Sequence, residues 1–381
     1  MERLCSTLCL VLAGLVVPAL ASAQQFQTAV YYDVARHGQL WGSVAADFNN
    51  DGNLDVAIAD QVNSKVDIML GAADGTFQPA SRFRAEIATG IAAGDLNGDG
   101  KVDLVVTRFQ DPGNIGIYFG NGDGTFHLST TATNGRQPIG VAIADLNGDG
   151  HSDFAVANSN TAGTAGNIMV FLNHGDGTFA SPVRYGSTGH PWSITAGDLN
   201  GDGHVDLVVT KDNYAGASGK NTLAILLNNG DGSFVNLANY SIGIEVMSAA
   251  IGDLNHDGKP DLAVADDSRL TVLLGNGDGT FGTPTFYKQS LGQAPNSVVI
   301  ADFNLDGTPD LAIGMLNGES IANTAIFYGN GDGTFQTPLP INAYLEGGNS
   351  MVSGDFDHDG APDLAMPIWL QGTLSVMLNA Q

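Results

Sequence analysis

The stretch DFNNDGNLD, residues 47–55, decides how this sequence is interpreted. Its first, third, fifth and ninth positions carry Asp or Asn, and its sixth position is Gly52. The same pattern, Asp-x-Asn/Asp-x-Asp-Gly-x-x-Asp, begins again at Asp95, Asp145, Asp198, Asp253, Asp302 and Asp355, at intervals of 48 to 55 residues. A fixed period of this length is typical of a repeat architecture, in which each repeat is one supersecondary unit.

A second pattern, Gly-Asp-Gly-Thr/Ser-Phe or a close variant, follows each of the first six loops. It ends at Phe77, Phe126, Phe179, Phe234, Phe281 and Phe335. Between these marks lie short runs rich in Val, Ile and aromatic residues, such as GVAIAD, FAVAN, NIMVFLN and ASPVRYG in the third repeat. Four such strands in a unit of about fifty residues predict a β-propeller blade. We expect the Phe to pack between neighbouring blades and the turn Asp to be structural.

The sequence therefore predicts an all-β, seven-bladed propeller with four antiparallel strands per blade. The residue before each loop is Ala or Gly in all seven repeats, as expected for an inner strand crowded around the axis. The seventh repeat has only three strands and no Gly-Asp-Gly-Thr-Phe turn, whereas residues 24–33, QQFQTAVYYD, resemble the outer strand TFQTPLPIN of residues 334–342. The N-terminal strand is thus predicted to close the last blade, which removes a free edge.

Residues 1–23 have the features of a secretory signal peptide: an early Arg3, an apolar run and a small-residue end, Ala21-Ser22-Ala23. The apolar run is too short to favour a membrane anchor. We expect residues 24–381 to form the propeller of a secreted or periplasmic protein without a membrane span. Cys5 and Cys9 are the two cysteines of the chain, so the mature protein is expected to be stabilised without disulfides.

The formal net charge is -26, from 40 acidic against 14 basic residues. This balance argues against nucleic acid as a partner, because no basic stripe is present to neutralise phosphates. The seven loops hold 22 of the 40 acids, which points to acids held in metal sites.

Each loop combines four side-chain oxygen ligands with a variable seventh position that offers its backbone carbonyl. Such a set of hard oxygen ligands favours Ca²⁺ over Mg²⁺. An EF-hand is excluded because position 12 is apolar, as at Ile58, instead of a bidentate Glu. The alternative is a set of Asp/Asn/Gly turns without metal. We expect up to seven Ca²⁺, held by Asp47, Asn49, Asp51, Asn53, Asp55, Asp95, Asn97, Asp99, Lys101, Asp103, Asp145, Asn147, Asp149, His151, Asp153, Asp198, Asn200, Asp202, His204, Asp206, Asp253, Asn255, Asp257, Lys259, Asp261, Asp302, Asn304, Asp306, Thr308, Asp310, Asp355, Asp357, Asp359, Ala361 and Asp363.

These loops make residues 24–381 resemble the FG-GAP/VCBS repeat family, whose fold is similar to the β-propeller of integrin α subunits. The resemblance implies that the loop joins the first and second strands of each blade on the lower face, and that ligands are met on the opposite face. Here all seven blades carry the loop, whereas integrins have it in only some. The resemblance does not imply an integrin partner subunit, and we expect a monomer.

The loops opposite the calcium face contain all three tryptophans. Trp41 and Trp192 occupy the same repeat position in blades one and four, and Trp369 lies between the second and third strands of blade seven. Tyr214 and Arg108 lie in or beside similar connections. Aromatic residues among small polar ones suit stacking on a sugar or a protein interface. The alternative is that the tryptophans seal blade junctions.

No nucleophile elbow, zinc motif or phosphate loop is apparent in the sequence, and no catalytic residue is assigned. We therefore favour a binding or adhesion module for a glycan or an extracellular protein over an enzyme. An extracellular carbohydrate-active enzyme, a polysaccharide lyase or hydrolase, is the alternative, because a pair of carboxylates could act on a glycosidic bond. A third hypothesis is that the protein is a purely structural component of the cell envelope.

Overall fold

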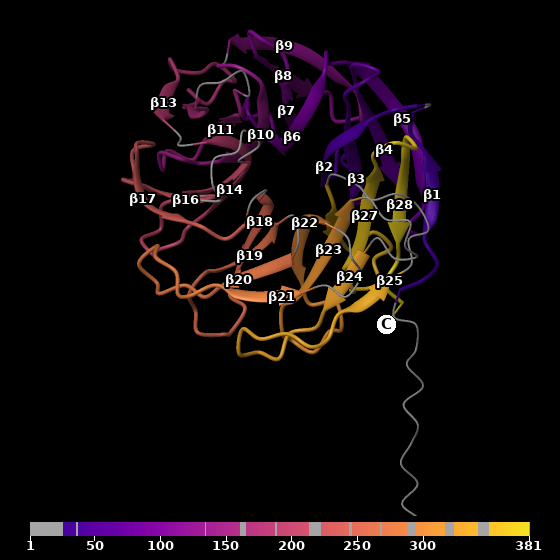
Figure 1. Ribbon diagram of the computed structural model, residues 1–381. Helices are drawn as coiled ribbons and strands as arrows, with labels where there is room; N and C mark the ends of the chain where they lie inside the picture. Colours follow the sequence, from indigo (N-terminus) through magenta and orange to yellow (C-terminus); the bar gives the residue numbers. More distant parts are fainter. Residues whose placement is uncertain are drawn as a thin grey trace, which may run out of the picture.

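The computed structural model describes residues 26–35, 37–133, 135–160, 165–186, 189–212, 222–243, 246–266, 269–288, 294–316, 324–341 and 350–380. The expected signal peptide, residues 1–23, lies outside these ranges. The described residues form seven sheets of four antiparallel strands, arranged as blades around a central axis (Figure 1). The predicted seven-bladed propeller is confirmed.

The blades follow one another in sequence order, and each is built from the inside outward. Blade one is β2 (Leu40–Ala46), β3 (Asp55–Asp60), β4 (Lys65–Gly71) and β5 (Phe77–Arg84). Blade two is β6 (Ala88–Gly94), β7 (Asp103–Arg108), β8 (Asn114–Gly120) and β9 (Phe126–Thr133). Blade three is β10 (Pro138–Ala144), β11 (Asp153–Asn158), β12 (Asn167–Phe171) and β13 (Val183–Gly186). Blade four is β14 (His190–Gly197), β15 (Asp206–Asp212), β16 (Leu223–Asn228) and β17 (Phe234–Tyr240).

The remaining blades repeat the plan. Blade five is β18 (Val246–Gly252), β19 (Asp261–Asp266), β20 (Arg269–Leu273) and β21 (Thr285–Lys288). Blade six is β22 (Ala294–Ala301), β23 (Asp310–Leu316), β24 (Thr324–Phe327) and β25 (Leu339–Ile341). Blade seven is β26 (Val352–Gly354), β27 (Asp363–Ile368), β28 (Thr373–Met377) and, from the other end of the chain, β1 (Val30–Asp33).

The chain ends interlock as the sequence predicted. β1 runs antiparallel to β28, with Val30 opposite Val376 and Asp33 opposite Thr373. In Figure 1 the indigo N-terminal strand lies beside the yellow C-terminal strands. The Phe26 ring lies 5.9 Å from the Phe303 ring of blade six, so Phe26 serves as the seventh inter-blade Phe. The ring is therefore closed by strand pairing between the two ends of the chain.

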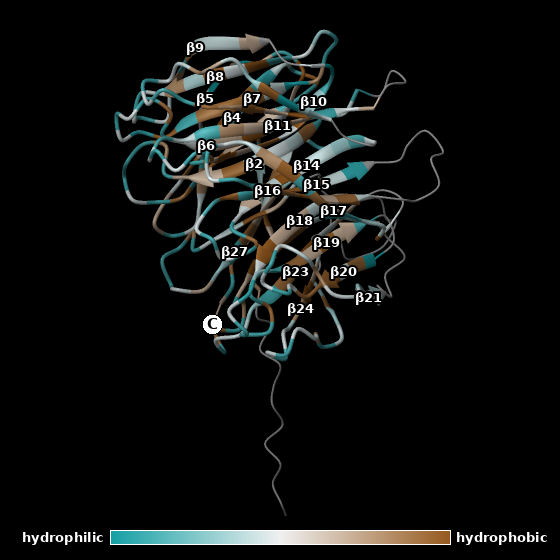
Figure 2. Ribbon diagram, turned by 90° about the vertical axis from the view of Figure 1, so that its left-hand side faces the viewer, coloured by the Kyte–Doolittle hydropathy of each residue, from teal (hydrophilic) through white to brown (hydrophobic). Residues whose placement is uncertain are grey.

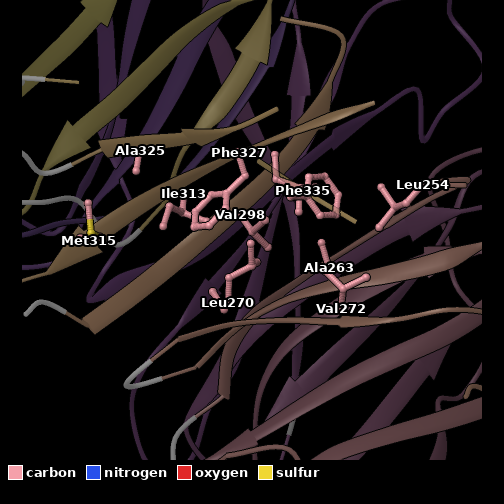
Figure 3. Packing of buried hydrophobic residues seen from close by; sticks show 12 residues of the cluster. Leu254, Ala263, Leu270, Val272, Val298, Ile313, Met315, Ala325, Phe327 and Phe335 are labelled. Atoms are coloured by element: carbon pink, nitrogen blue, oxygen red, sulfur yellow. The ribbon is translucent and has the colours of Figure 1, made fainter. Parts of the chain in front are cut away.

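The core is divided into seven hydrophobic clusters, and each joins two neighbouring blades. In Figure 3, Leu270 and Val272 of blade five face Val298, Ile313 and Phe327 of blade six. Figure 2 shows the same division along the strands, with apolar strand centres and more hydrophilic loops at their ends. Within the described ranges, no helix is long and apolar enough to cross a membrane.

A β-bulge recurs where the inner strand of a blade begins. In blade one the register shifts between Leu40 and Ser43, and a matching shift occurs in blades two to six. A bulge places one extra residue on the bulged strand and re-aims its side chains. It lies at the end of the inner strand opposite the Asp-rich loop, because that loop follows the strand's last residue.

Candidate functional site

The seven Asp-rich loops lie at one end of the ring, each between the first and second strands of its blade. Asp47 at position 1 accepts backbone hydrogen bonds from Asp51 at 3.1 Å and Gly52 at 2.9 Å. The glycine at position 6 of every loop makes the same bond to its Asp at position 1, and every one has a positive φ, between 78° and 91°. These bonds curl the loop so that its side-chain oxygens turn inward.

The Asp at position 9 is completely buried in all seven blades. Asp55 accepts backbone hydrogen bonds from Phe48 and Gly71, both at 2.8 Å, and so ties its loop to the end of the third strand. Burial raises the pKa of Asp55 to about 6, and the nearby carboxylates of Asp51 and Asp47 add to this increase. The two backbone hydrogen bonds act in the opposite direction and lower the pKa. Burial likewise raises the pKa of Asp363 to about 7. A bound cation offsets the electrostatic repulsion between closely spaced carboxylates of this kind.

Blade seven brings its carboxylates closest together. Asp355, Asp357 and Asp363 each place an oxygen so that all three lie within 4.8 Å of one another, the one such group found among the described residues. Asp357 stands where the other loops have Asn, and Oδ1 of Asp355 is buried without a hydrogen-bond partner. These oxygens fit a divalent cation that prefers oxygen ligands. The other six loops present the same backbone frame with an amide at position 3.

The Gly-Asp-Gly-Thr-Phe turns stabilise the contacts between neighbouring blades. Asp74 accepts hydrogen bonds from the backbone N–H and the hydroxyl of Thr76, and four of the other five turns repeat both bonds. In the remaining turn, Asp231 accepts the backbone N–H of Ser233. These bonds lower the pKa of Asp74. The Phe that follows packs against the preceding blade: Phe281 lies 6.0 Å from the Tyr240 ring and donates its N–H to the Tyr240 hydroxyl at 2.8 Å. The predicted inter-blade role of the Phe is confirmed.

At the opposite end, the bulged starts of the inner strands surround a pocket of about 190 Å³ on the propeller axis. The lining includes one Gly or Ser from each blade at the same repeat position: Gly42, Gly90, Gly140, Ser193, Ser248, Ser297 and Ser350. In blades one to three the neighbouring backbone comes too close for a side chain. A Cβ on Gly90 would lie 2.0 Å from the carbonyl oxygen of Ile139. Blades four to seven instead carry hydroxyls.

Trp41 and Trp192 meet in this axial pocket. Their ring centroids are 5.9 Å apart with an interplanar angle of 45°, although they come from blades one and four. At the same repeat position, blades two, three, five and six have Thr89, Ile139, Met247 and Asn296, which also line the pocket. The two tryptophans therefore line a shared pocket. Nε1 of Trp41 is buried and has no hydrogen-bond partner.

The remaining candidates lie elsewhere. Trp369 follows β27 at the junction of blades seven and one, where its carbonyl accepts the N–H of Leu40 at 3.2 Å. Arg108 is only 8% exposed, and its guanidinium donates to the Tyr118 hydroxyl at 2.6 Å and to Asn114 at 3.2 Å. Tyr214 lies outside the described residues. The structure thus brings two of the five candidates together and uses Arg108 inside blade two.

The Ser and Gly lining was missed by sequence reasoning. The sequence signal was available, since position -5 relative to the first loop Asp is Gly or Ser in every repeat. The Ala or Gly directly before each loop identifies the inner strand but not the residues that line the axial pocket.

The comparisons with known proteins agree with this architecture. A model described as an FG-GAP-like repeat matches residues 47–106, 95–156, 145–209, 211–264 and 253–313. The curated proteins contain no match to the sequence.

Among solved structures, a lectin of Agrocybe aegerita, described as recognising non-reducing terminal N-acetylglucosamine, is 20% identical. It has a TM-score of 0.55 over 83% of this chain and 81% of that one. BBS1N in complex with ARL6DN, in a crystal soaked with mercury, is 14% identical with a TM-score of 0.61 over 94% and 97% of the chains. These structures share the fold. Since the matched repeats cover more than half of the sequence, the chain belongs to the FG-GAP-like repeat family.

Proposed function

We propose that the protein is an exported, calcium-loaded binding module whose axial pocket recognises a sugar ring of an extracellular glycan. The observation that carries this proposal is the meeting of Trp41 and Trp192 in a pocket of about 190 Å³ at the end of the ring opposite the Asp-rich loops.

The lining suits an uncharged ligand with both apolar faces and hydroxyls. Indole rings provide large apolar faces for stacking, while Ser193, Ser248 and Asn296 supply hydrogen-bonding groups beside them. None of the described residues that line the pocket carries a charged side chain. The lectin of similar fold supports a glycan as the ligand class.

Calcium has a structural part in this proposal. Cations bound by the seven loops offset the repulsion among the clustered carboxylates at the lower end, and so keep the inner strands in register at the upper end. Residues 1–23 direct the chain to a compartment where calcium and glycans are present.

A glycan array probed with calcium-saturated protein tests the proposal. We expect selective binding that is lost in Trp192→Ala while the bound calcium, measured by elemental analysis, stays unchanged. Trp41→Ala is also expected to lose glycan binding and keep its calcium, because both indole rings line the same pocket.

Phe286→Ala is the matched control, since Phe286 is 46% exposed on the outer strand β21, far from the axis. Glycan binding that survives in both Trp variants would reject the axial pocket. Binding of a matrix protein without any glycan would favour a protein ligand, and cleavage of a polysaccharide would favour the enzyme alternative.

A further inference from the structure

A buried carboxylate that the fold does not require lies at the junction of blades seven and one. Asp67 is on β4, opposite Ile58 of β3 and Arg82 of β5, and only 2% of it is exposed. Neither carboxylate oxygen accepts a hydrogen bond. The Arg82 Nε lies 3.3 Å from Oδ1, which makes an ion pair by distance but without hydrogen-bond geometry, and half of the Arg82 side chain is exposed. Burying a charge without hydrogen-bond donors is costly.

The other blades show that this position accepts neutral residues. Each blade has one residue opposite position 12 of its loop on the third strand. These residues are Gly116, Met169, Ala224, Thr271, Ala325 and Ser375. All six are uncharged. Packing of the blade therefore does not explain an Asp at residue 67.

A pocket of about 570 Å³ opens beside Asp67, between the N-terminal segment of blade seven and the third and fourth strands of blade one. Its described lining is Asp33, Val34, Ala35, Asn63, Lys65, Asp67, Arg82 and Gln371. A smaller cavity of about 90 Å³ adjoins it and shares Val34, Asp67 and Arg82. The volume lies in the range of small-molecule sites. The two chain ends meet at this junction, and they contribute Asp33, Val34, Ala35 and Gln371 to the lining.

Among the described residues of the lining, acidic and basic side chains are equal in number. Asp33 and Asp67 are opposed by Lys65 and Arg82, two of only 14 basic residues in a chain with a net charge of -26. A simple cation would find many stronger acidic sites on such a protein, and a simple anion would be repelled by it. A ligand that carries both charges matches both pairs at once.

We infer that the pocket at the junction of blades seven and one binds a small zwitterion with adjacent ammonium and carboxylate groups, the chemistry of a free α-amino acid. The ammonium group donates to the Asp67 carboxylate and takes the place of Arg82. The exposed Arg82 swings outward and pairs with the ligand carboxylate, with Lys65 beside it. This site is separate from the axial pocket and does not depend on the function proposed for it.

Titration calorimetry of the full mature chain in excess calcium tests the inference, with the twenty free L-amino acids as probes. We expect at least one to bind saturably with one site per chain. Asp67→Asn should weaken that affinity about tenfold or more, because a charge-assisted hydrogen bond is lost. The amide and the N-acetyl derivative of the best probe, which each lack one charge, should lose affinity to a similar extent.

Three further variants make the result decisive. Asp67→Ser copies Ser375 of blade seven and should fold and lose binding, and Arg82→Gln should also weaken it. Trp192→Ala should bind the amino acid unchanged, which separates this site from the axial pocket. The inference is overturned if no amino acid binds saturably, if Asp67→Asn and Asp67→Ser bind as well as the parent, or if the amide binds as well as the free acid.

Discussion

Glycine has two different tasks in this protein, and neighbouring atoms distinguish them. At position 6 of the Asp-rich loops, as at Gly52, no atom lies within 4 Å of where a Cβ would be, so the positive φ alone demands glycine. At Gly90 the φ is ordinary, but the backbone of blade three occupies the space. The first requirement is local, whereas the second exists only in the closed ring.

We expect Gly90→Ala to destabilise the protein by roughly 1–3 kcal/mol, because the added Cβ must displace the Ile139 carbonyl. Gly186→Ala is the control, since nothing lies within 4 Å of its Cβ, and it should change stability by less than about 0.5 kcal/mol. Urea unfolding of both variants measures the difference. Equal stabilities would contradict the close packing at the axis.

Asp67 should make stability depend on pH. Burial raises its folded-state pKa to about 6 from 3.8, even though Arg82 opposes the shift. The folded state then holds the proton more tightly than the unfolded state, so stability falls as pH rises from about 4 to about 6. Asp67→Asn removes this loss and should be more stable than the parent by about 2–3 kcal/mol at pH 7, with little difference at pH 4. Chemical unfolding at both pH values checks this, and a difference that did not vary with pH would refute it.

Among the elements, the outer strand and the turn before it hold neighbouring blades together. Phe281 is 6% exposed, sits in a cluster shared by blades four and five, and contacts Tyr240 through both its ring and its N–H. The same pairing recurs between Tyr185 and Phe234. Each Gly-Asp-Gly-Thr-Phe turn therefore directs an aromatic ring into the junction behind it.

Phe281→Ala is expected to cost about 3–5 kcal/mol, since a large buried ring is removed from a packed junction. Phe286→Ala on β21 should cost far less, because that ring is 46% exposed and lies under the Arg269 guanidinium, whose carbon is 3.9 Å from the ring centroid. Thermal unfolding of the two variants compares them directly. Similar losses would show that the turn Phe does not hold blades together.

For the whole molecule, the described fold is a ring closed by hydrogen bonds between its two ends, with the Asp-rich loops gathered at one end. If these loops hold calcium, removal of the metal leaves clustered carboxylates facing one another. We expect exhaustive chelation to lower the melting temperature by at least about 10 °C and to release several calcium ions per chain, with recovery on adding Ca²⁺ but not on adding Mg²⁺. Calorimetry with elemental analysis measures both quantities, and an unchanged melting temperature at zero calcium content would oppose the calcium assignment.

Much of this architecture was determined by the sequence alone. Seven evenly spaced loops, the strand runs between them and the outer-strand pattern of residues 24–33 predicted the number of blades, the inner strand and the closure of the ring. These features recur in successive repeats because each depends on nearby residues alone. They are a turn that needs a positive φ, a strand with β-branched residues and an aromatic ring beside a turn. Local rules can be read along a chain.

Only the tertiary structure decided which residues form the two pockets. Trp41 and Trp192 lie 151 positions apart in the chain, and they meet because bulges in the inner strands of blades one and four aim both toward one axis. Arg108, by contrast, is drawn into blade two by the Tyr118 hydroxyl. Asp67 gains its pocket solely because the N-terminal segment returns to blade one. Contacts across the axis and across the junction of the chain ends depend on how the ring closes, which no single repeat encodes.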